Sequence, residues 1–270
     1  MAGSEATGKV NVDKVQLRAC STLEELTACV ELQREVWGFS DLDLVPLRVF
    51  SLAGKIGGQV IGAWDGDTMV GFALSVPGTH RRYPYLHSHM LGVKESYRNT
   101  GLGRRIKLAQ REDAIARGVD LIEWTFDPLE IKNAYFNIER LGAIARRYNL
   151  NQYGITTSPL QGFLPTDRLV AEWWVKSKRV ESLLSDGHLP GFQPAMQISV
   201  PAEIYAWKAQ PETRPRAADV QTRNRELFLD AFSKGLSCLG YGRGEDGRGV
   251  FMLGRWDEDW SFATSSPTTA

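Results

Sequence analysis

Two histidines stand two residues apart, just ahead of a glycine-bearing loop. His87 and His89 lie in an alternating stretch that predicts a strand over residues 85–93, so both side chains should lie on one face of that strand. Imidazole is the one side chain whose unperturbed pKa lies near neutrality, and a histidine so placed can take a proton from an ammonium group. The alternative is that both are ordinary histidines of a packed strand.

The loop after this strand is suited to a phosphate group. Its sequence, Arg98-Asn99-Thr100-Gly101-Leu102-Gly103, leads into a predicted helix over 102–117, with Arg104 as a further cation. Glycines let a backbone approach a ligand closely, and a helix N-terminus presents free N–H groups at the positive end of its dipole. No Gly-Lys-Ser/Thr follows, which argues against a P-loop, and the preceding hairpin argues against a dinucleotide-binding fingerprint.

The elements that must position this stretch alternate along the chain. Asp65-Gly66 between two alternating apolar runs predicts a hairpin. Strands are predicted over 14–20, 59–64, 69–76, 120–126, 143–153 and 169–175, and helices over 22–37, 46–53 and 133–141. Trp173 and Trp174 indicate a core strand. The pattern weakens beyond Lys176 and resumes with a short helix near 201–207, a helix over 222–234 and strands over 236–241 and 250–255. The fold class is therefore α/β (α+β), a mixed sheet with helices.

Composition narrows the class of protein. The 270 residues carry 32 basic and 32 acidic side chains, which gives no reason to expect a nucleic-acid partner. Three cysteines without ligand spacing argue against a metal site and favour a reducing compartment. No apolar run is long enough to span a membrane, and the N-terminus lacks the apolar region of a signal peptide. We therefore expect a cytoplasmic protein with neither membrane nor nucleic-acid partners.

Two motifs together resemble the GCN5-related N-acetyltransferase (GNAT) superfamily. Leu91-Gly92-Val93 followed by the loop fits the family's Arg/Gln-x-x-Gly-x-Gly/Ala signature, and residues 133–142 resemble its helix that ends in Leu-Gly. The match covers about residues 14–176 and is closest to a less characterised branch with Trp124-Thr-Phe-Asp-Pro128. The resemblance implies a mostly antiparallel central sheet flanked by helices. It also implies a flexible segment 1–12, an acyltransferase domain 13–177, an α/β extension 178–260 that packs on it and a flexible tail 261–270.

The resemblance also implies the donor, an acyl-CoA, with no metal. Acetyl-CoA is the first expectation and succinyl-CoA the alternative. The N–H groups of 99–104 would hold the pyrophosphate, and the backbone at Leu91 and Val93 would pair with the pantetheine amides. Asn133 and Asn137 share one helix face and would either bind pantetheine or, for Asn133, cap the helix. The expected donor-binding residues are Leu91, Gly92, Val93, Arg98, Asn99, Thr100, Gly101, Leu102, Gly103, Arg104, Asn133 and Asn137.

For catalysis, the His-x-His spacing is similar to that of serotonin N-acetyltransferases, which implies that His89 or His87 is the base. The position where many members have a tyrosine acid holds Ile138, so Tyr135 one turn earlier is the candidate. Tyr148 and Tyr153 are further options, and each of the three could instead be a packing aromatic.

The acceptor is expected to be a small-molecule amine. Glu123 and Asp127 could bind that amine, although a structural role or a helix cap would explain them equally. Arg48, and with it Lys55, Arg81 and Arg82, could bind a carboxylate, which suits an amino acid, or be solvated surface. The C-terminal extension would cover the acceptor site or form a homodimer contact. The rival functions are a non-catalytic CoA-binding regulatory module and a nucleotide-binding α/β enzyme.

Overall fold

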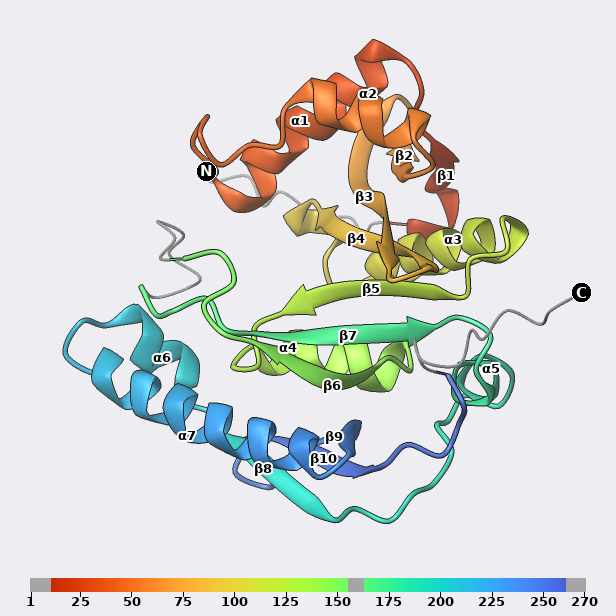
Figure 1. Cartoon of the computed structure of the whole chain (residues 1–270). Helices are drawn as coiled ribbons and strands as arrows, with labels where there is room; N and C mark the ends of the chain where they lie inside the picture. Colours follow the sequence, from red (N-terminus) through yellow and green to blue (C-terminus); the bar gives the residue numbers. More distant parts are fainter. Residues whose placement is uncertain (1–10, 155–162, 261–270) are drawn as a thin grey trace, which may run out of the picture. The chain divides into compact units, whose positions relative to one another are not determined.

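The computed structural model describes residues 11–154 and 163–260, and these divide into two compact units. The first unit is Met1–Gly78 with Leu86–Arg117, and the second is Thr79–Tyr85 with Gly118–Ala270. Figure 1 labels the elements of both. The predicted segment 1–12 and tail 261–270 lie almost wholly outside the described residues, and the predicted domain bounds stay a prediction.

The first unit carries the histidines and the glycine loop. Its strands run in the order β1-β2-β3-β4, with β1–β2 and β2–β3 antiparallel. The strands are β1 (Gln16–Ala19), β2 (Gln59–Asp65), β3 (Thr68–His80) and β4 (Tyr83–Val93). The helices are α1 (Leu23–Trp37), α2 (Leu47–Lys55) and α3 (Leu102–Ala116), with short 3-10 turns η1 (Val12–Lys14) and η2 (Glu95–Tyr97).

Local signals set the ends of these elements, including the hairpin that the sequence predicts. The Thr22 hydroxyl accepts from the Glu25 N–H at 3.3 Å and the Glu25 carboxylate accepts from the Thr22 N–H at 3.1 Å, which is a capping box at the start of α1. Gly38 ends that helix at φ 63°. The β2–β3 hairpin turns at Gly66, with φ 58° and Asp65 paired to Thr68.

The core of the first unit has two apolar clusters and one polar row. Residues of α1 and α2 pack on β2 and β3 in one cluster, and α3 packs on the sheet through Leu102 and Ile106 in the other. These two residues are buried on the inner face of α3, whereas Ala109 is only half-buried. Lys107 and Gln110 are buried instead, because they too lie on the stripe that a 3.6-residue period turns inward.

These two polar residues join a hydrogen-bonded row beneath β4. The Lys107 Nζ donates to Ser88 Oγ at 2.7 Å, Ser88 donates to the Gln110 side chain at 3.1 Å, and Gln110 donates to Ser75 at 2.6 Å. Ser75 in turn donates to Gln59 at 2.9 Å. The row therefore connects β2, β3, β4 and α3 through buried groups that satisfy one another.

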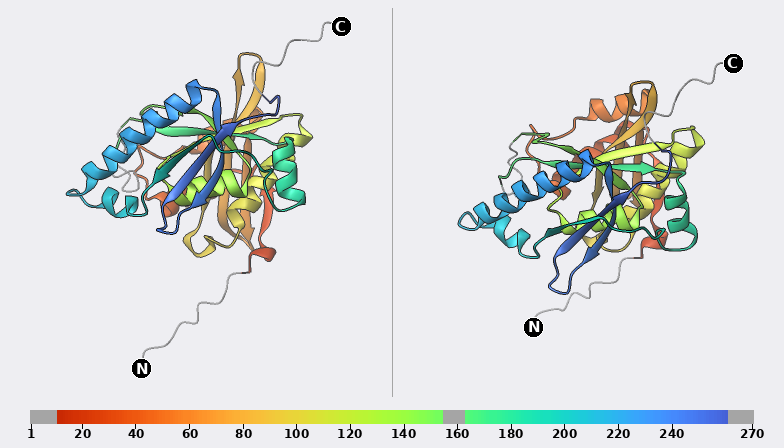
Figure 2. Two further views of the ribbon diagram at one scale, coloured as in Figure 1. Left: turned by 90° about the horizontal axis from the view of Figure 1, so that it is seen from below. Right: turned by 60° about the horizontal axis from the view of Figure 1, so that its bottom comes forward.

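The second unit is built on the strand order β5-β7-β6-β9-β10-β8, and its recorded strand pairs are antiparallel. The strands are β5 (Leu121–Phe126), β6 (Ile144–Asn149), β7 (Arg168–Trp174), β8 (Met196–Val200), β9 (Leu236–Arg243) and β10 (Gly249–Arg255). The helical elements are α4 (Ile131–Tyr135), its π-helical continuation η3 (Phe136–Arg140), α5 (Lys178–Ser185), α6 (Ile204–Ala209) and α7 (Arg214–Ser233). The two views in Figure 2 show α7 as the long helix beside β8, β9 and β10.

Three elements of the second unit differ from the prediction. Helix α7 begins at Arg214 rather than at residue 222, because Pro215 suits a first helical turn. Helix α5 was not predicted, and it is a short helix that Ser177 caps by accepting from the Val180 N–H. The strand predicted over 143–153 ends at Asn149. The core role of Trp173 and Trp174 is confirmed, since both are essentially fully buried.

Candidate functional site

The two histidines share the more open face of β4, as the alternation predicted. Burial alternates along the strand: Ser88, Met90 and Gly92 are buried, whereas His87 is half-buried and His89 exposed. The imidazole ring centres lie 6.3 Å apart. The buried side of the strand is fixed by core packing, so the opposite side chains are held in a defined direction.

The neighbourhood of His89 favours its neutral form. Desolvation by surrounding atoms lowers the pKa of this imidazole, and a positive charge on His87 lowers it further. At neutral pH His89 therefore has an unprotonated nitrogen, which is the form that a general base requires.

Gly92 lies at a close packing point of β4. A Cβ at this position would lie 3.0 Å from the Phe72 ring and 3.1 Å from Trp37. A side chain here would require these aromatic rings to shift, so glycine eases the close approach of the strand. Leu91 and Val93 are half-buried on the face that carries the histidines.

The loop after β4 turns sharply into α3. Asn99 has φ 61° and Gly101 has φ 91°, and no atom lies within 4 Å of where a Cβ of Gly101 would be. Arg105 donates the first helical backbone bond, to the Gly101 carbonyl at 3.1 Å. The N–H groups of Leu102 and Gly103 precede it and have no acceptor within the helix. Such a helix start is suited to an anion.

Arg98 makes contacts other than the predicted one. Its Nε donates to the Val93 carbonyl at 3.3 Å and its guanidinium also reaches the Val36 carbonyl at 3.4 Å. The side chain thus fastens the loop to the end of β4 and to α1, a role that sequence spacing cannot reveal. As a charge on the pyrophosphate, Arg98 remains a prediction.

The helix predicted near Asn133–Gly142 lies in the second unit as α4 and its π-helical continuation η3. Glu130 is the N-cap, so the alternative that Asn133 caps the helix is wrong. Asn137 is buried, and its Oδ1 accepts from the Trp124 indole at 3.1 Å. Its Nδ2 is buried with no partner among the described residues. A buried donor without an acceptor is costly.

The candidate acids differ in their surroundings. Tyr135 is 43 % exposed at the end of α4. Tyr148 donates to Asp167 at 2.9 Å, and its pKa is raised far above the usual value, first by burial and then by that carboxylate. Tyr153 shares a 3.0 Å hydrogen bond with Thr125. Among the three, Tyr148 therefore fits the packing role.

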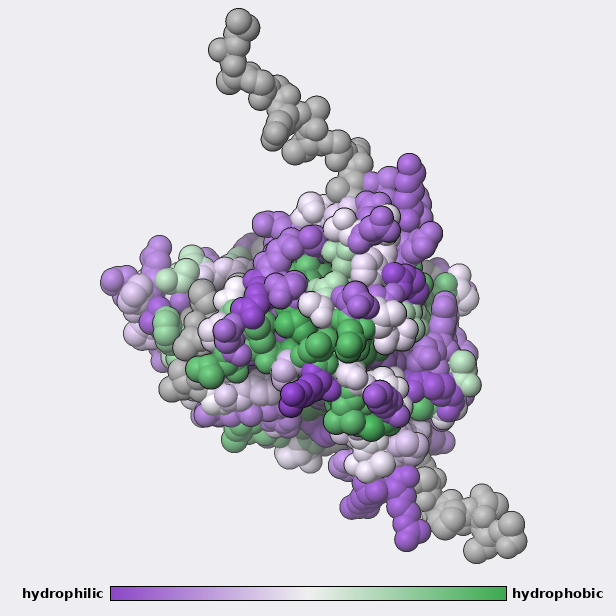
Figure 3. All heavy atoms as spheres, turned by 90° about the horizontal axis from the view of Figure 1, so that it is seen from above, coloured by the Kyte–Doolittle hydropathy of each residue, from purple (hydrophilic) through white to green (hydrophobic). Residues whose placement is uncertain are grey.

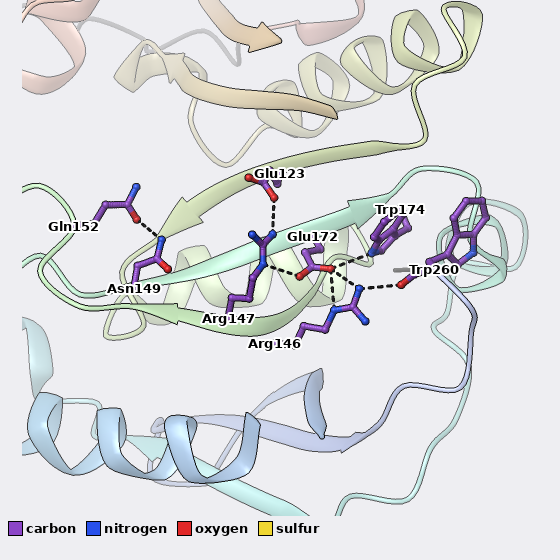
Figure 4. Close-up of polar contacts among 8 residues, drawn as sticks. All are labelled: Glu123, Arg146, Arg147, Asn149, Gln152, Glu172, Trp174 and Trp260. Atoms are coloured by element: carbon purple, nitrogen blue, oxygen red, sulfur yellow. Dashed lines mark hydrogen bonds and ion pairs between the residues drawn. The ribbon is translucent and has the colours of Figure 1, made fainter. Parts of the chain in front are cut away.

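Glu123 belongs to a charge cluster on the sheet of the second unit, drawn in Figure 4. Its carboxylate accepts from Arg147, which also donates to Glu172 at 3.0 Å. Arg146 donates to Glu172 from the other side at 3.0 Å. A substrate ammonium at Glu123 would have to compete with Arg147, so the structure places this carboxylate in a structural role and its substrate contact stays a prediction.

Asp127 is likewise engaged within the chain. Its Oδ2 accepts from Lys208 Nζ at 3.0 Å, and Lys208 also contacts Glu130 at 2.8 Å. Its Oδ1 accepts from the Leu129 N–H at 2.8 Å, a local turn and not the helix cap considered from the sequence. Lys208 lies 81 residues further along the chain, and no spacing pattern connects the two.

Arg48 lies exposed on α2, whose outer side also carries apolar residues. Val49, Leu52 and Ile56 are 37 %, 54 % and 53 % exposed. Figure 3, seen from the side of Figure 1 on which α1 and α2 are drawn, shows apolar side chains gathered among polar ones on that face. A carboxylate contact of Arg48 stays a prediction.

Within 11–154 and 163–260, no group of three or more His, Cys, Asp or Glu side chains is placed to hold a metal ion. In the same ranges, no helix has the length and apolar character needed to cross a bilayer.

Similarity to known proteins agrees with this arrangement. Residues 26–142 match the family described as "Acetyltransferase (GNAT) family". The mostly antiparallel fold, the glycine loop at the start of α3 and this match define the class, a CoA-dependent N-acyltransferase. Residues 26–142 therefore hold a GNAT acetyltransferase domain, as the resemblance of the motifs predicted.

Solved structures with a similar fold share little sequence with the chain. The ribosomal-protein-S18-alanine N-acetyltransferase of Escherichia coli is 14 % identical, with 60 % of this chain and 95 % of that one covered and a TM-score of 0.49. A Salmonella typhimurium acetyltransferase solved with acetyl-CoA is 13 % identical, with 62 % and 98 % covered and a TM-score of 0.49. No curated protein sequence matches the chain.

Proposed function

We propose that the chain transfers an acyl group, acetyl in the first place, from CoA to the amine of a small molecule by direct attack, with His89 or His87 as the base. The observation that carries this proposal is a single arrangement in the first unit. Both histidines lie on the open face of β4, which ends six residues after His87. The glycine loop follows the strand and leads into α3. Base and anion-binding loop are therefore held by one strand and one helix.

The residues fit an acyl-CoA donor in two ways. Amide groups 102–104 at the start of α3 would hold the pyrophosphate, and the open space at Gly101 leaves room for it. The unpartnered Nδ2 of Asn137 would donate to a pantetheine carbonyl. When bound, the thioester supplies an activated acyl carbonyl.

The chain's own groups would then manage protons and charge. Neutral His89 takes a proton from the acceptor ammonium, directly or through water, and so frees the amine for attack. A backbone N–H near Leu91 would hold the carbonyl oxygen as negative charge develops. Tyr135 or water would return a proton to the leaving thiolate. We propose an amino acid as the acceptor, with its carboxylate at Arg48, and the amine to be transferred near His89.

Donor binding and turnover test the proposal separately. Thermal shift with acetyl-CoA, succinyl-CoA, free CoA and ATP should show stabilisation by CoA species but not by ATP alone. An amine panel with detection of released thiol should then identify acceptors. Stabilisation without thiol release for any amine would favour the non-catalytic CoA-binding module, and no stabilisation by any CoA species would reject the proposal.

Gly101 offers a sharper test of the loop. Gly101→Ala places a Cβ on a backbone at φ 91°, a strain of roughly 1–2 kcal/mol that should shift the loop amides. We expect acetyl-CoA affinity to fall about tenfold by calorimetry, since 1.4 kcal/mol corresponds to a factor of ten. Gly118→Ala is the matched control, because Gly118 follows the other end of α3 at φ 71° and also has no neighbour within 4 Å of its Cβ position. Equal donor affinity in both variants would place the donor elsewhere.

A further inference from the structure

The fold of the first unit brings together two cysteines that are nine residues apart in sequence. Cys20 follows β1 and Cys29 lies in α1. The Thr22 capping box between them turns the chain back, so the inner face of α1 packs on the sheet, and both cysteines join the same apolar cluster. Their thiols lie within hydrogen-bonding reach of each other. Spacing alone predicted no relation between them.

The surroundings of the two thiols differ. A Cβ on Gly62 would lie 2.7 Å from Cys20 Sγ and 2.5 Å from the Trp64 Nε1, so this glycine makes room for a sulfur beside an indole N–H. The Arg18 guanidinium also stands over the Trp64 ring, 4.5 Å from its centre. The Cys29 thiol and then Arg18 lower the pKa of Cys20 against the effect of burial, whereas Cys20 and burial raise that of Cys29. Cys20 is thus the more acidic of the two thiols and Cys29 the less acidic.

Only one of the two cysteines borders a cavity. A cavity of about 540 Å³ opens between β1, the start of β2, α2 and α3, and Cys20 is among its lining residues while Cys29 is not. Cys20 is 8 % exposed and Cys29 fully buried. A molecule as small as a hydroperoxide fits this space and would meet Cys20 first.

We propose that Cys20 and Cys29 form a redox-reactive dithiol that a hydroperoxide oxidises to a disulfide. The Cys20 thiolate attacks the terminal peroxide oxygen, the O–O bond breaks, and the alkoxide or hydroxide leaves and takes up a proton, with Cys20 as sulfenic acid. Cys29 sulfur then attacks Cys20 sulfur, the S–O bond breaks, and water leaves with the Cys29 proton. Two thiols and one hydroperoxide thus become a disulfide, an alcohol or water, and one further water.

The third cysteine is an internal control. Cys238 lies on β9 in the second unit, fully buried, with its sulfur 3.8 Å from the Gly240 carbonyl. Burial raises its pKa, so it should not react with peroxide in the folded chain.

The test uses the full-length reduced chain and hydrogen peroxide. Intact mass should fall by two hydrogens, peptide mapping should find Cys20 joined to Cys29, and dithiothreitol should reverse both. Cys29→Ser should stop at a sulfenic acid that dimedone labels at Cys20, while Cys20→Ser should not react and Cys238→Ser should behave as the parent. Retention of both thiols in the parent chain, labelling of Cys238 first, or peroxide reaction of Cys29 in Cys20→Ser would each overturn the proposal. The parent-chain mass does not depend on whether any variant folds.

Discussion

Replacing both β4 histidines should lower turnover by roughly 10²–10⁴-fold while leaving acetyl-CoA affinity unchanged, because a positioned base contributes about that factor to proton transfer. His87 and His89 face away from the buried side of the strand, where Ser88, Met90 and Gly92 pack. The double variant His87→Ala/His89→Ala therefore removes imidazoles without opening the core. Turnover by thiol release and donor affinity by calorimetry separate chemistry from binding.

The single variants should differ in their pH profiles. The lowered pKa of His89 places the acidic limb of kcat/KM below pH 6.5 in the parent chain, since the base form is lost only there. A charge on His87 is one cause of that lowering, so His87→Ala should move the limb to higher pH. In His89→Ala the limb that belongs to His89 should vanish together with most of the turnover. A merely structural histidine would change turnover without moving the limb.

His188 is the matched control for both variants. It is exposed and lies after α5 in the second unit, outside every element of the proposed site. His188→Ala should keep the turnover and the pH profile of the parent. If the double β4 variant also kept its turnover, neither imidazole would be the base, and the donor-binding proposal at the loop would stand without it.

Much of this fold is predictable because its signals are local. Short sequence patterns predict the ends of several elements. The examples are Thr22 with Glu25 three residues later, Gly38 after α1, and Asp65-Gly66 between two apolar runs. The face shared by the two histidines follows from strand alternation alone.

What sequence reasoning missed depends on contacts between distant residues. The partner of Asp127 is Lys208, and Glu123 meets Arg147 across the sheet, so neither carboxylate could be recognised as occupied from its neighbours in sequence. The bond from Arg98 to the Val93 carbonyl is likewise invisible in the sequence. Such pairings depend on strand order and register, which a charge pattern does not encode.

Lys107 is the most consequential of these missed residues, and replacing it should stabilise the chain. The residue is 2 % exposed on the inner side of α3, and burial lowers the pKa of its ammonium group to about 7 from 10.5. At 1.36 kcal/mol per unit, that difference corresponds to a charging cost of about 5 kcal/mol in the folded state. Lys107→Met keeps the length of the side chain and removes the charge. We expect the free energy of unfolding to rise by roughly 2–5 kcal/mol near pH 6, the lower figure allowing for the lost bond to Ser88.

The gain should depend on pH in a definite direction. Below pH 7 the lysine is protonated in both the folded and the unfolded chain, so the parent bears the full cost. Between about pH 7 and 10.5 the unfolded chain binds more protons at this group than the folded chain does, and the parent becomes more stable as pH rises. The advantage of Lys107→Met should therefore shrink across that range, measured by urea unfolding at a series of pH values.

Exposed Lys14 in η1 provides the control, since Lys14→Met should change the free energy of unfolding by less than about 0.5 kcal/mol at any of these pH values. Loss of stability in Lys107→Met at pH 6 would mean that the hydrogen bonds of the buried row outweigh the cost of the charge.

Because Lys107 holds Ser88, which lies between the two histidines on the other face of β4, acetyl transfer by the stabilised variant should also be measured. Reduced turnover at unchanged donor affinity would identify Lys107 as a positioning residue that holds the catalytic face of the strand at a cost in stability.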